Sequence, residues 1–120
     1  LDMNADGGRI VIFSDGAAEN RRPYAGFRHY LVSKAAASAL VRALAVDFGP
    51  KILVNGIAPG PILPPPEYSA DAIKAVADTV ILKKWGGAEE IARAVIYLLE
   101  QEFMTGQVLT IDGGRYLASS

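Results

Sequence analysis

Short apolar runs alternate along the chain with longer segments in which apolar residues recur at helical spacing. Residues 8–13 and 51–58 are apolar at almost every position, and 107–112 form a third, similar run. Runs of this kind are typical of parallel strands that are covered on both faces. The pattern therefore predicts three buried strands, separated by segments long enough to hold helices.

Two long helices are predicted in the segments between these strands. Residues 27–48 are rich in alanine and leucine, and Gly49 followed by Pro50 ends this helix. Its expected apolar stripe comprises Val32, Ala36, Leu40, Leu44 and Phe48, with Val41 and Ala45 beside them. Residues 88–100 form the second helix, whose expected buried face consists of Ile91, Val95 and Leu98.

The segment between the second strand and the second helix is broken by prolines. Pro59-Gly60 and the prolines that follow interrupt regular structure, and Ser69 is placed to cap a short helix that runs to Asp78. Residues 79–85 give no clear pattern, and Gly86-Gly87 predict a turn.

The order of these elements predicts an α/β fold with a doubly wound parallel sheet and right-handed crossovers. The first strand would then be a hydrophobic edge with nothing beside it. The chain also begins Leu1-Asp2-Met3, which is unlike a usual initiation sequence. We therefore expect residues 1–120 to be the carboxyl-terminal half of a single domain whose amino-terminal half is absent from the chain.

The composition excludes several classes of function. Of the 120 residues 51% are hydrophobic, the net charge is −1, and basic residues are scattered, so we expect no nucleic-acid partner. No apolar run approaches the ~18–20 residues of a membrane span. Cysteine is absent and His29 is the single histidine, so we expect no disulfide and no metal site. These features favour a cytoplasmic protein.

Tyr30 and Lys34 are the candidate catalytic pair. On the predicted helix they lie one turn apart on one face, with Cβ atoms roughly 5–6 Å from each other. An ammonium this close to a phenol is expected to lower the tyrosine pKa from its usual value near ~10. Such a tyrosine can act as a general acid or base. The alternative is a half-buried tyrosine beside a lysine that extends to solvent.

Four motifs in this order resemble the second half of the short-chain dehydrogenase/reductase family. They are the strand Gly8–Phe13, Tyr30-x-x-x-Lys34, Asn55-Gly-Ile-Ala-Pro59-Gly60-Pro-Ile62 and Thr105-Gly106-Gln-Val-Leu-Thr-Ile-Asp112-Gly113-Gly114. The resemblance covers nearly all of the chain. It implies a Rossmann-like domain, of which 1–120 would be the carboxyl-terminal half, and a dinucleotide-binding half that the chain lacks.

The resemblance leaves two candidates for the third catalytic group. The family's serine normally follows the first strand of this half, but here Ser14 lies one place early and Asp15 stands at the expected position. Either a one-residue shift lets Ser14 serve, or Asp15 replaces it, as in the pteridine reductase branch. The segments Leu82-Lys-Lys-Trp-Gly-Gly and Asp-Gly-Gly-Arg115 also resemble that branch.

The family's mechanism implies roles for the remaining site residues. Tyr30 would deliver a proton, and Lys34 would bind the nicotinamide ribose. Pro59 and Gly60 would lie against the nicotinamide, and the backbone of Ile62 would hold its carboxamide. Residues 63–85 would form the substrate loop, with candidate wall residues Leu63, Tyr68 and Trp85, although Trp85 could equally pack the loop against the helix that follows it.

The expected cofactor is NADPH, because pteridine reductases use it. No glycine-rich pyrophosphate-binding turn follows a strand in this sequence, so the chain alone is not expected to hold a dinucleotide. The resemblance thus implies an NADPH-dependent reductase of pterins or folates, acting on a small molecule as a homodimer or homotetramer. The alternatives are a 3-oxoacyl or general carbonyl reductase that uses Ser14, and a non-catalytic assembly module.

Overall fold

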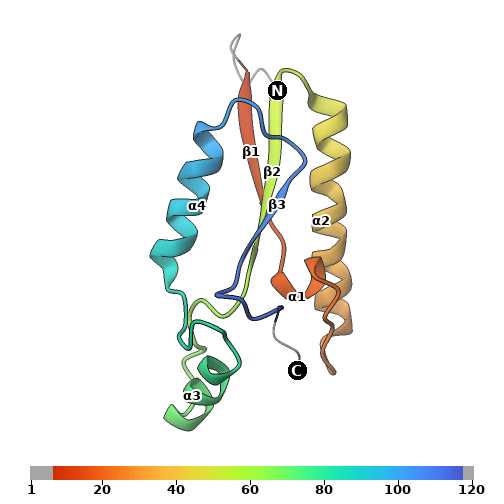
Figure 1. Ribbon diagram of the computed structural model, residues 1–120. Coiled ribbons are helices and arrows are strands. Elements are labelled where there is room, and N and C mark those ends of the chain that lie inside the picture. The colour runs from red at the N-terminus through yellow and green to blue at the C-terminus, as the bar shows by residue number, and fades with distance from the viewer. Residues whose placement is uncertain (1–6, 118–120) are drawn as a thin grey trace.

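The computed structural model describes residues 7–117, so the unusual start of the chain and its last three residues lie outside the described part. Strands β1 (Gly8–Phe13), β2 (Ile52–Pro59) and β3 (Val108–Ile111) form one parallel sheet in the order β1-β2-β3 (Figure 1). The predicted three parallel strands are confirmed, with bounds that differ by a residue or two.

All three strands end at the same edge of the sheet. β1 pairs with β2 from Gly8 opposite Ile52 to Phe13 opposite Ile57, and the end of β2 pairs with β3. β1 is an edge strand of the described sheet, as the sequence predicts. Because the strands are parallel, the segments that follow them meet at one end of the molecule, the lower end in Figure 1.

Helices cover both faces of the sheet, which confirms the doubly wound α/β fold. Helix α2 (Arg28–Phe48) packs on one face and α4 (Ala88–Glu100) on the other (Figure 1). Val41 of α2 and Val54 of β2 are fully buried and form the core with Ala45. On the opposite face Leu98 of α4 is buried, while Ile91 and Val95 are half-buried.

The face of α2 that packs on the sheet differs from the predicted stripe. The buried residues of α2 are Leu31, Ser38, Val41 and Ala45. Val32 and Leu40, which belong to the predicted stripe, are 69% and 47% exposed. A helix this rich in apolar residues has two apolar sides. The sheet packs against the side that carries Ser38 and Ala45, because these small side chains allow the helix and the sheet to approach closely.

Two short helices lie at the carboxyl edge of the sheet. Helix α1 (Gly16–Glu19) was not predicted, because one helical turn is too short to show a periodic pattern. Helix α3 (Ala70–Asp78) begins after Ser69, whose hydroxyl accepts a hydrogen bond from Ala72 N, so the predicted cap is confirmed. The ambiguous residues 79–85 form turns rather than a helix or strand.

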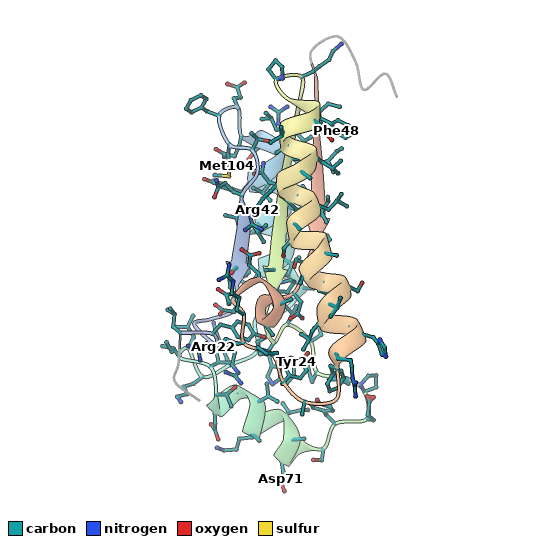
Figure 2. The ribbon with its side chains drawn as sticks, turned by 90° about the vertical axis from the view of Figure 1, so that its right-hand side faces the viewer. Arg22, Tyr24, Arg42, Phe48, Asp71 and Met104 are labelled. Atoms are coloured by element: carbon teal, nitrogen blue, oxygen red, sulfur yellow. The ribbon has the colours of Figure 1, made fainter. Side chains whose placement is uncertain are left out.

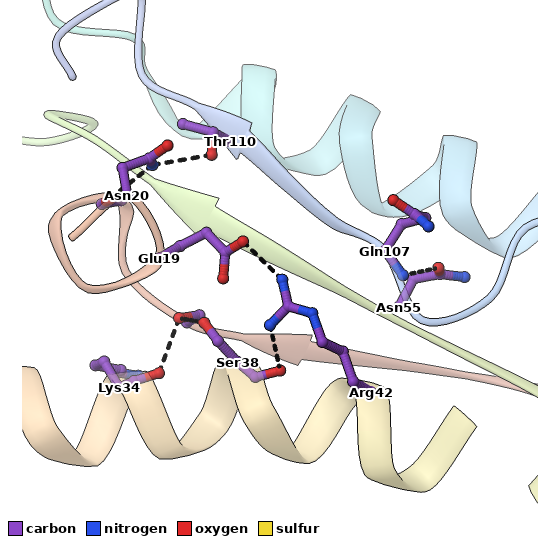
Figure 3. Close-up of polar contacts among 10 residues, drawn as sticks. Glu19, Asn20, Lys34, Ser38, Arg42, Asn55, Gln107 and Thr110 are labelled. Atoms are coloured by element: carbon purple, nitrogen blue, oxygen red, sulfur yellow. Dashed lines mark hydrogen bonds and ion pairs between the residues drawn. The ribbon is translucent and has the colours of Figure 1, made fainter. Parts of the chain in front are cut away.

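Asn55 fixes the segment before β3 to the central strand. Its side chain is almost fully buried, accepts a hydrogen bond from Gln107 N at 3.0 Å (Figure 3) and donates one to Met104 O at 2.9 Å. A buried amide with both groups bonded stabilises a single register. This Asn belongs to one of the motifs that carry the family resemblance, and its contacts here are structural. None of the described helices has the length and apolar character needed to span a membrane.

Two of the three valines of α2 offer a matched test of this packing. Val41 is 0% exposed and Val46 is 82% exposed on the same helix. Val41→Ala should lower the free energy of unfolding by about 2–3 kcal/mol, because it removes buried methyl groups and leaves a cavity. Val46→Ala should change the free energy of unfolding of this chain, measured as a monomer, by less than about 0.5 kcal/mol. Denaturant unfolding measures both, and equal losses would contradict this assignment of the buried face.

Candidate active site

Asp15 and Tyr30 meet at the carboxyl edge of the sheet. The Tyr30 hydroxyl donates a hydrogen bond to Oδ2 of Asp15 at 3.2 Å. The other oxygen, Oδ1, accepts from Ala17 N at 2.8 Å and from Ala18 N at 3.4 Å, so Asp15 is also the N-cap of α1. One carboxylate therefore fixes the first turn of α1 and accepts a hydrogen bond from the candidate proton donor.

The pKa of Tyr30 is raised, not lowered. Partial burial and the nearby charge and hydrogen bond of Asp15 raise the pKa of Tyr30 to about 12. The sequence-based expectation that Lys34 lowers this pKa is therefore wrong for the chain as described, because burial and Asp15 set its direction. The phenol is protonated at neutral pH.

Lys34 does lie beside Tyr30, as the spacing predicts. Its Nζ is 5.9 Å from the centre of the Tyr30 ring and donates to the carbonyl oxygen of Phe13 at 3.4 Å. An ammonium has three donors, so donors remain for a ligand. Lys34 and Tyr30 thus present a cation and a hydroxyl at the same edge of the sheet.

The Ser14 hydroxyl contacts Lys34 and Ser38 of α2 and not the Tyr30 hydroxyl. Its side chain is buried and its hydroxyl donates to the carbonyl oxygen of Lys34 at 2.9 Å. The same hydroxyl lies 2.5 Å from the hydroxyl of Ser38. Lys34 and Ser38, the α2 side of these contacts, are labelled in Figure 3. These contacts tie the end of β1 to α2 and leave the Ser14 hydroxyl engaged inside the protein.

Two further links hold α1 in place beside these residues. The Glu19 carboxylate pairs with the Arg42 guanidinium at 2.9 Å, and Arg42 also donates to the carbonyl oxygen of Ser38 (Figure 3). The Asn20 amide donates to Thr110 Oγ1 at 3.1 Å (Figure 3). Helix α1 is therefore bonded to α2 on one side and to β3 on the other.

Two other tyrosines lie near the Asp15 carboxylate, and the sequence analysis missed both. Burial and the charge of Asp15 raise the pKa of Tyr24, with a smaller effect from Tyr68. Burial and Asp15 also raise the pKa of Tyr116 to about 12. Tyr24 comes from the loop before α2 (Figure 2) and Tyr116 from the segment after β3. The position of Tyr116 just beyond a strand end was the one available signal.

The corner at Pro59 and Gly60 lies at the same edge, where β2 ends. Gly60 N donates to Ile111 O at 2.9 Å, and a Cβ at Gly60 would lie 2.6 Å from Cβ of Asp112. The close approach that requires glycine here is therefore to the residue after β3. The carbonyl of Ile62 accepts a hydrogen bond from Gly87 N at 3.0 Å, which ties the corner to the start of α4.

The predicted substrate loop, residues 63–85, contains α3 at the lower end of the molecule (Figures 1 and 2). Trp85 donates from its indole N–H to Ile73 O at 3.0 Å, so it packs the loop against α3. Tyr68 lies edge-on to Trp85 with ring centres 6.4 Å apart. Leu63 and Tyr68 are exposed.

A cavity of about 300 Å³ lies on the α4 side of this edge. Its lining includes Ile62, Lys84, Glu90 and Thr110, but not Tyr30, Lys34 or Asp15. This cavity is therefore separate from the Asp15–Tyr30 contact. Within residues 7–117 no cluster of His, Cys, Asp or Glu side chains is arranged to hold a metal ion.

The residues at this edge fit the nicotinamide and ribose end of a dinucleotide. Lys34 offers ammonium donors to ribose hydroxyl groups, and Tyr30 offers a protonated hydroxyl beside it. The corner at Pro59 and Gly60 follows a strand, the place where open α/β sheets bind ligands.

The chain is similar to known proteins over most of its length. A family model described as Enoyl-(Acyl carrier protein) reductase matches residues 1–115. The chain is 37% identical to 7alpha-hydroxysteroid dehydrogenase of Escherichia coli (strain K12), over 94% of this chain and 46% of that protein. It is 33% identical to the short-chain dehydrogenase/reductase homolog YusR of Bacillus subtilis (strain 168), over 86% of this chain and 85% of YusR.

Solved structures give the same result. The crystal structure of FolM Alternative dihydrofolate reductase 1 from Brucella suis, in complex with NADP, superposes with a TM-score of 0.86 at 32% identity. The match covers 96% of this chain and 46% of that one, so the chain spans about half the length of this enzyme and of the hydroxysteroid dehydrogenase. The chain belongs to the short-chain dehydrogenase/reductase family.

Proposed function

We propose that the complete protein is an NADPH-dependent reductase of a pterin or folate-like substrate, with residues 1–120 as the carboxyl-terminal half of its domain. The observation that carries the proposal is the hydrogen bond from Tyr30 to Asp15, which places a carboxylate where a ketone reductase needs only a hydroxyl. The FolM neighbour, described as a dihydrofolate reductase in complex with NADP, supports both the substrate class and the cofactor.

The residues of this chain position and protonate the substrate. The reduced nicotinamide supplies the hydride when bound. Tyr30 holds a proton at its hydroxyl, because its raised pKa keeps the phenol protonated at neutral pH. Lys34 is placed to bind the ribose and to stabilise the phenolate that forms as the proton leaves.

Asp15 gives an amino-substituted ring an advantage over a ketone. A substrate that places N–H donors or a positive charge against the Asp15 carboxylate offsets the charge that raises the Tyr30 pKa. Burial, the larger cause of the raised Tyr30 pKa, remains, but the Asp15 contribution becomes weaker, so Tyr30 gives up its proton more readily. A ketone carries no such group, so binding it would leave Tyr30 a weak acid.

Aromatic side chains near the site favour a flat substrate. Tyr24 and Phe27 lie edge-on with ring centres 5.0 Å apart and are exposed, and Tyr68 is exposed at the start of the predicted substrate loop. Flat rings bind between such side chains by stacking. This supports a pterin ring over a flexible aliphatic chain.

A carbonyl reductase that uses Ser14 is the second candidate. It is supported by the hydroxysteroid dehydrogenase relative, whose name refers to a hydroxysteroid and not to a pterin. Against it, the Ser14 hydroxyl is already bonded to Lys34 O and lies beside Ser38. We therefore propose Asp15, not Ser14, as the third group of the site.

We also propose that the complete protein acts as a homo-oligomer in the cytoplasm. The exposed side of α2 carries Val32, Leu40 and Val46, which are 69%, 47% and 82% exposed. Apolar side chains along one helix face are favourable for burial against another subunit. A non-catalytic assembly module would use the same surface but would bind no NADPH, so NADPH titration of the complete protein separates these two readings.

The substrate class is tested with the complete protein, NADPH, and two substrates, dihydrobiopterin and an acetoacetyl thioester. We expect turnover of the pterin to exceed that of the thioester. Tyr30→Phe should lower turnover by about 10²–10⁴-fold, because it removes the proton donor. Its circular dichroism spectrum should match that of the wild type. Turnover of the thioester alone would contradict the pterin proposal, and near-normal rates for Tyr30→Phe would contradict the assigned acid.

One substitution at each residue tests whether Asp15 or Ser14 is the third group of the site. Asp15→Ser should reduce pterin turnover by about 10²-fold and ketone turnover by less, because the carboxylate that binds the amino edge is lost. Ser14→Ala should act mainly on stability, lowering the free energy of unfolding by about 1–2 kcal/mol because it removes bonds to Lys34 and Ser38. Steady-state rates and denaturant unfolding check this. A larger loss of turnover in Ser14→Ala would favour Ser14.

The influence of Asp15 on Tyr30 is measurable without a substrate. Asp15→Asn removes a negative charge, so the Tyr30 pKa should fall below about 12. Burial, the larger cause of the shift, should keep this pKa above the usual value, and the variant should carry more phenolate than the wild type at alkaline pH. Tyr24 and Tyr116 should shift in the same direction. The ultraviolet absorbance of phenolate gives the titration. The control Asp47→Asn lies near the far end of α2 and should change nothing.

A further inference from the structure

The segment after β3 is folded back toward the sheet by one carboxylate. Asp112 Oδ1 accepts from Gly114 N and Oδ2 accepts from Tyr116 N, both at 2.9 Å. Gly113 and Gly114 have φ values of 61° and 86°, which glycine adopts without strain. Two hydrogen bonds to the Asp112 side chain fix the direction of this turn. The turn places the Tyr116 side chain at the edge of the sheet where β1 ends.

The Tyr116 ring lies directly on Gly16, the first residue of α1. A Cβ at Gly16 would lie 2.3 Å from Cε2 of Tyr116 and 2.9 Å from the carbonyl oxygen of Pro59. Gly16 is buried and Tyr116 is half-buried. The backbone at Gly16 is therefore held between the ring of Tyr116 and the end of β2, with no room for a side chain.

Gly16 is the residue next to Asp15. The Asp15 carboxylate keeps its orientation through bonds to the amides of Ala17 and Ala18, so it moves with the first turn of α1. Packing of the Tyr116 ring on Gly16 therefore helps to fix the orientation of the Asp15 carboxylate, including its oxygen Oδ2. The charge of Asp15 also contributes, after burial, to the raised pKa of Tyr116, which agrees with their proximity.

We propose that Tyr116 is a positioning residue for the site: its ring packs on Gly16, fixes the first turn of α1, and so holds the Asp15 carboxylate against the Tyr30 hydroxyl. The proposal rests on the proposed function for the role of Asp15. The aromatic ring of Tyr116, and not its hydroxyl, has this positioning role. The Arg115 guanidinium lies 5.6 Å from the centre of the Tyr116 ring and adds a favourable cation–π contact.

The test uses three variants of the complete protein. Tyr116→Ala removes the ring, Tyr116→Phe keeps it, and Leu117→Ala is the matched control, because Leu117 is the next residue and is 80% exposed. The first readout is hydrogen exchange in a peptide that spans residues 14–20, which contains the two amides bonded to Asp15. The second is the steady-state kinetics of dihydrobiopterin reduction.

Tyr116→Ala should speed exchange in this peptide by about tenfold, because the first turn of α1 opens more often. It should lower kcat by about tenfold with KM within about twofold, since Asp15 no longer holds its geometry at Tyr30. Tyr116→Phe should retain wild-type values in both measurements, and so should Leu117→Ala. Should Tyr116→Ala fail to fold, Tyr116→Leu takes its place with the same expected results.

Unchanged exchange in Tyr116→Ala would overturn the proposal. So would a loss in Tyr116→Phe equal to that in Tyr116→Ala, which would assign the role to the hydroxyl, or an equal effect of Leu117→Ala, which would indicate a general loosening of the chain end. If the wild type reduces no pterin but exchange responds as expected, the positioning of Asp15 stands and the proposed substrate class fails. The two failures are thus distinguishable.

Discussion

The two oxygens of the Asp15 carboxylate hold the carboxyl edge of this protein together. One closes the first turn of α1 through Ala17 N, and the other accepts a hydrogen bond from Tyr30 at the start of α2. A helix cap contributes about 1 kcal/mol in ordinary proteins, but here the same group also raises the pKa of a candidate proton donor. The geometry of the candidate site and the stability of α1 therefore both depend on the Asp15 side chain.

Much of the fold follows from the sequence because its signals are local and strong. The apolar runs that form β1 and β2 can be recognised without knowing which elements they pack against. Gly49 with Pro50 ends α2 at the predicted position. The approximate position of the site follows as well. Parallel strands bring the residues after β1 and β2 to one edge, and helical spacing places Lys34 beside Tyr30.

The remainder depends on contacts between distant parts of the chain. The sheet packs against the side of α2 that carries Ser38 and Ala45. Which side is buried depends on how closely β2 approaches the helix, and the spacing of apolar residues along the sequence does not give that distance. The Tyr30 pKa depends on burial and on Asp15, fifteen positions away in the chain. Tyr116 reaches the first turn of α1 only because Asp112 bends the chain after β3.

The edge position of β1 in residues 7–117 has a consequence for handling this chain when it is separated from the rest of the proposed domain. A strand at the side of a sheet presents a row of backbone amides and carbonyls that any extended peptide can pair with, and β1 carries the apolar residues Ile10, Val11 and Ile12. During refolding, this row is available to other unfolded molecules before tertiary packing is complete. Recovery of native material should therefore depend on protein concentration, and dilute refolding is the condition under which the edge is least prone to mispairing.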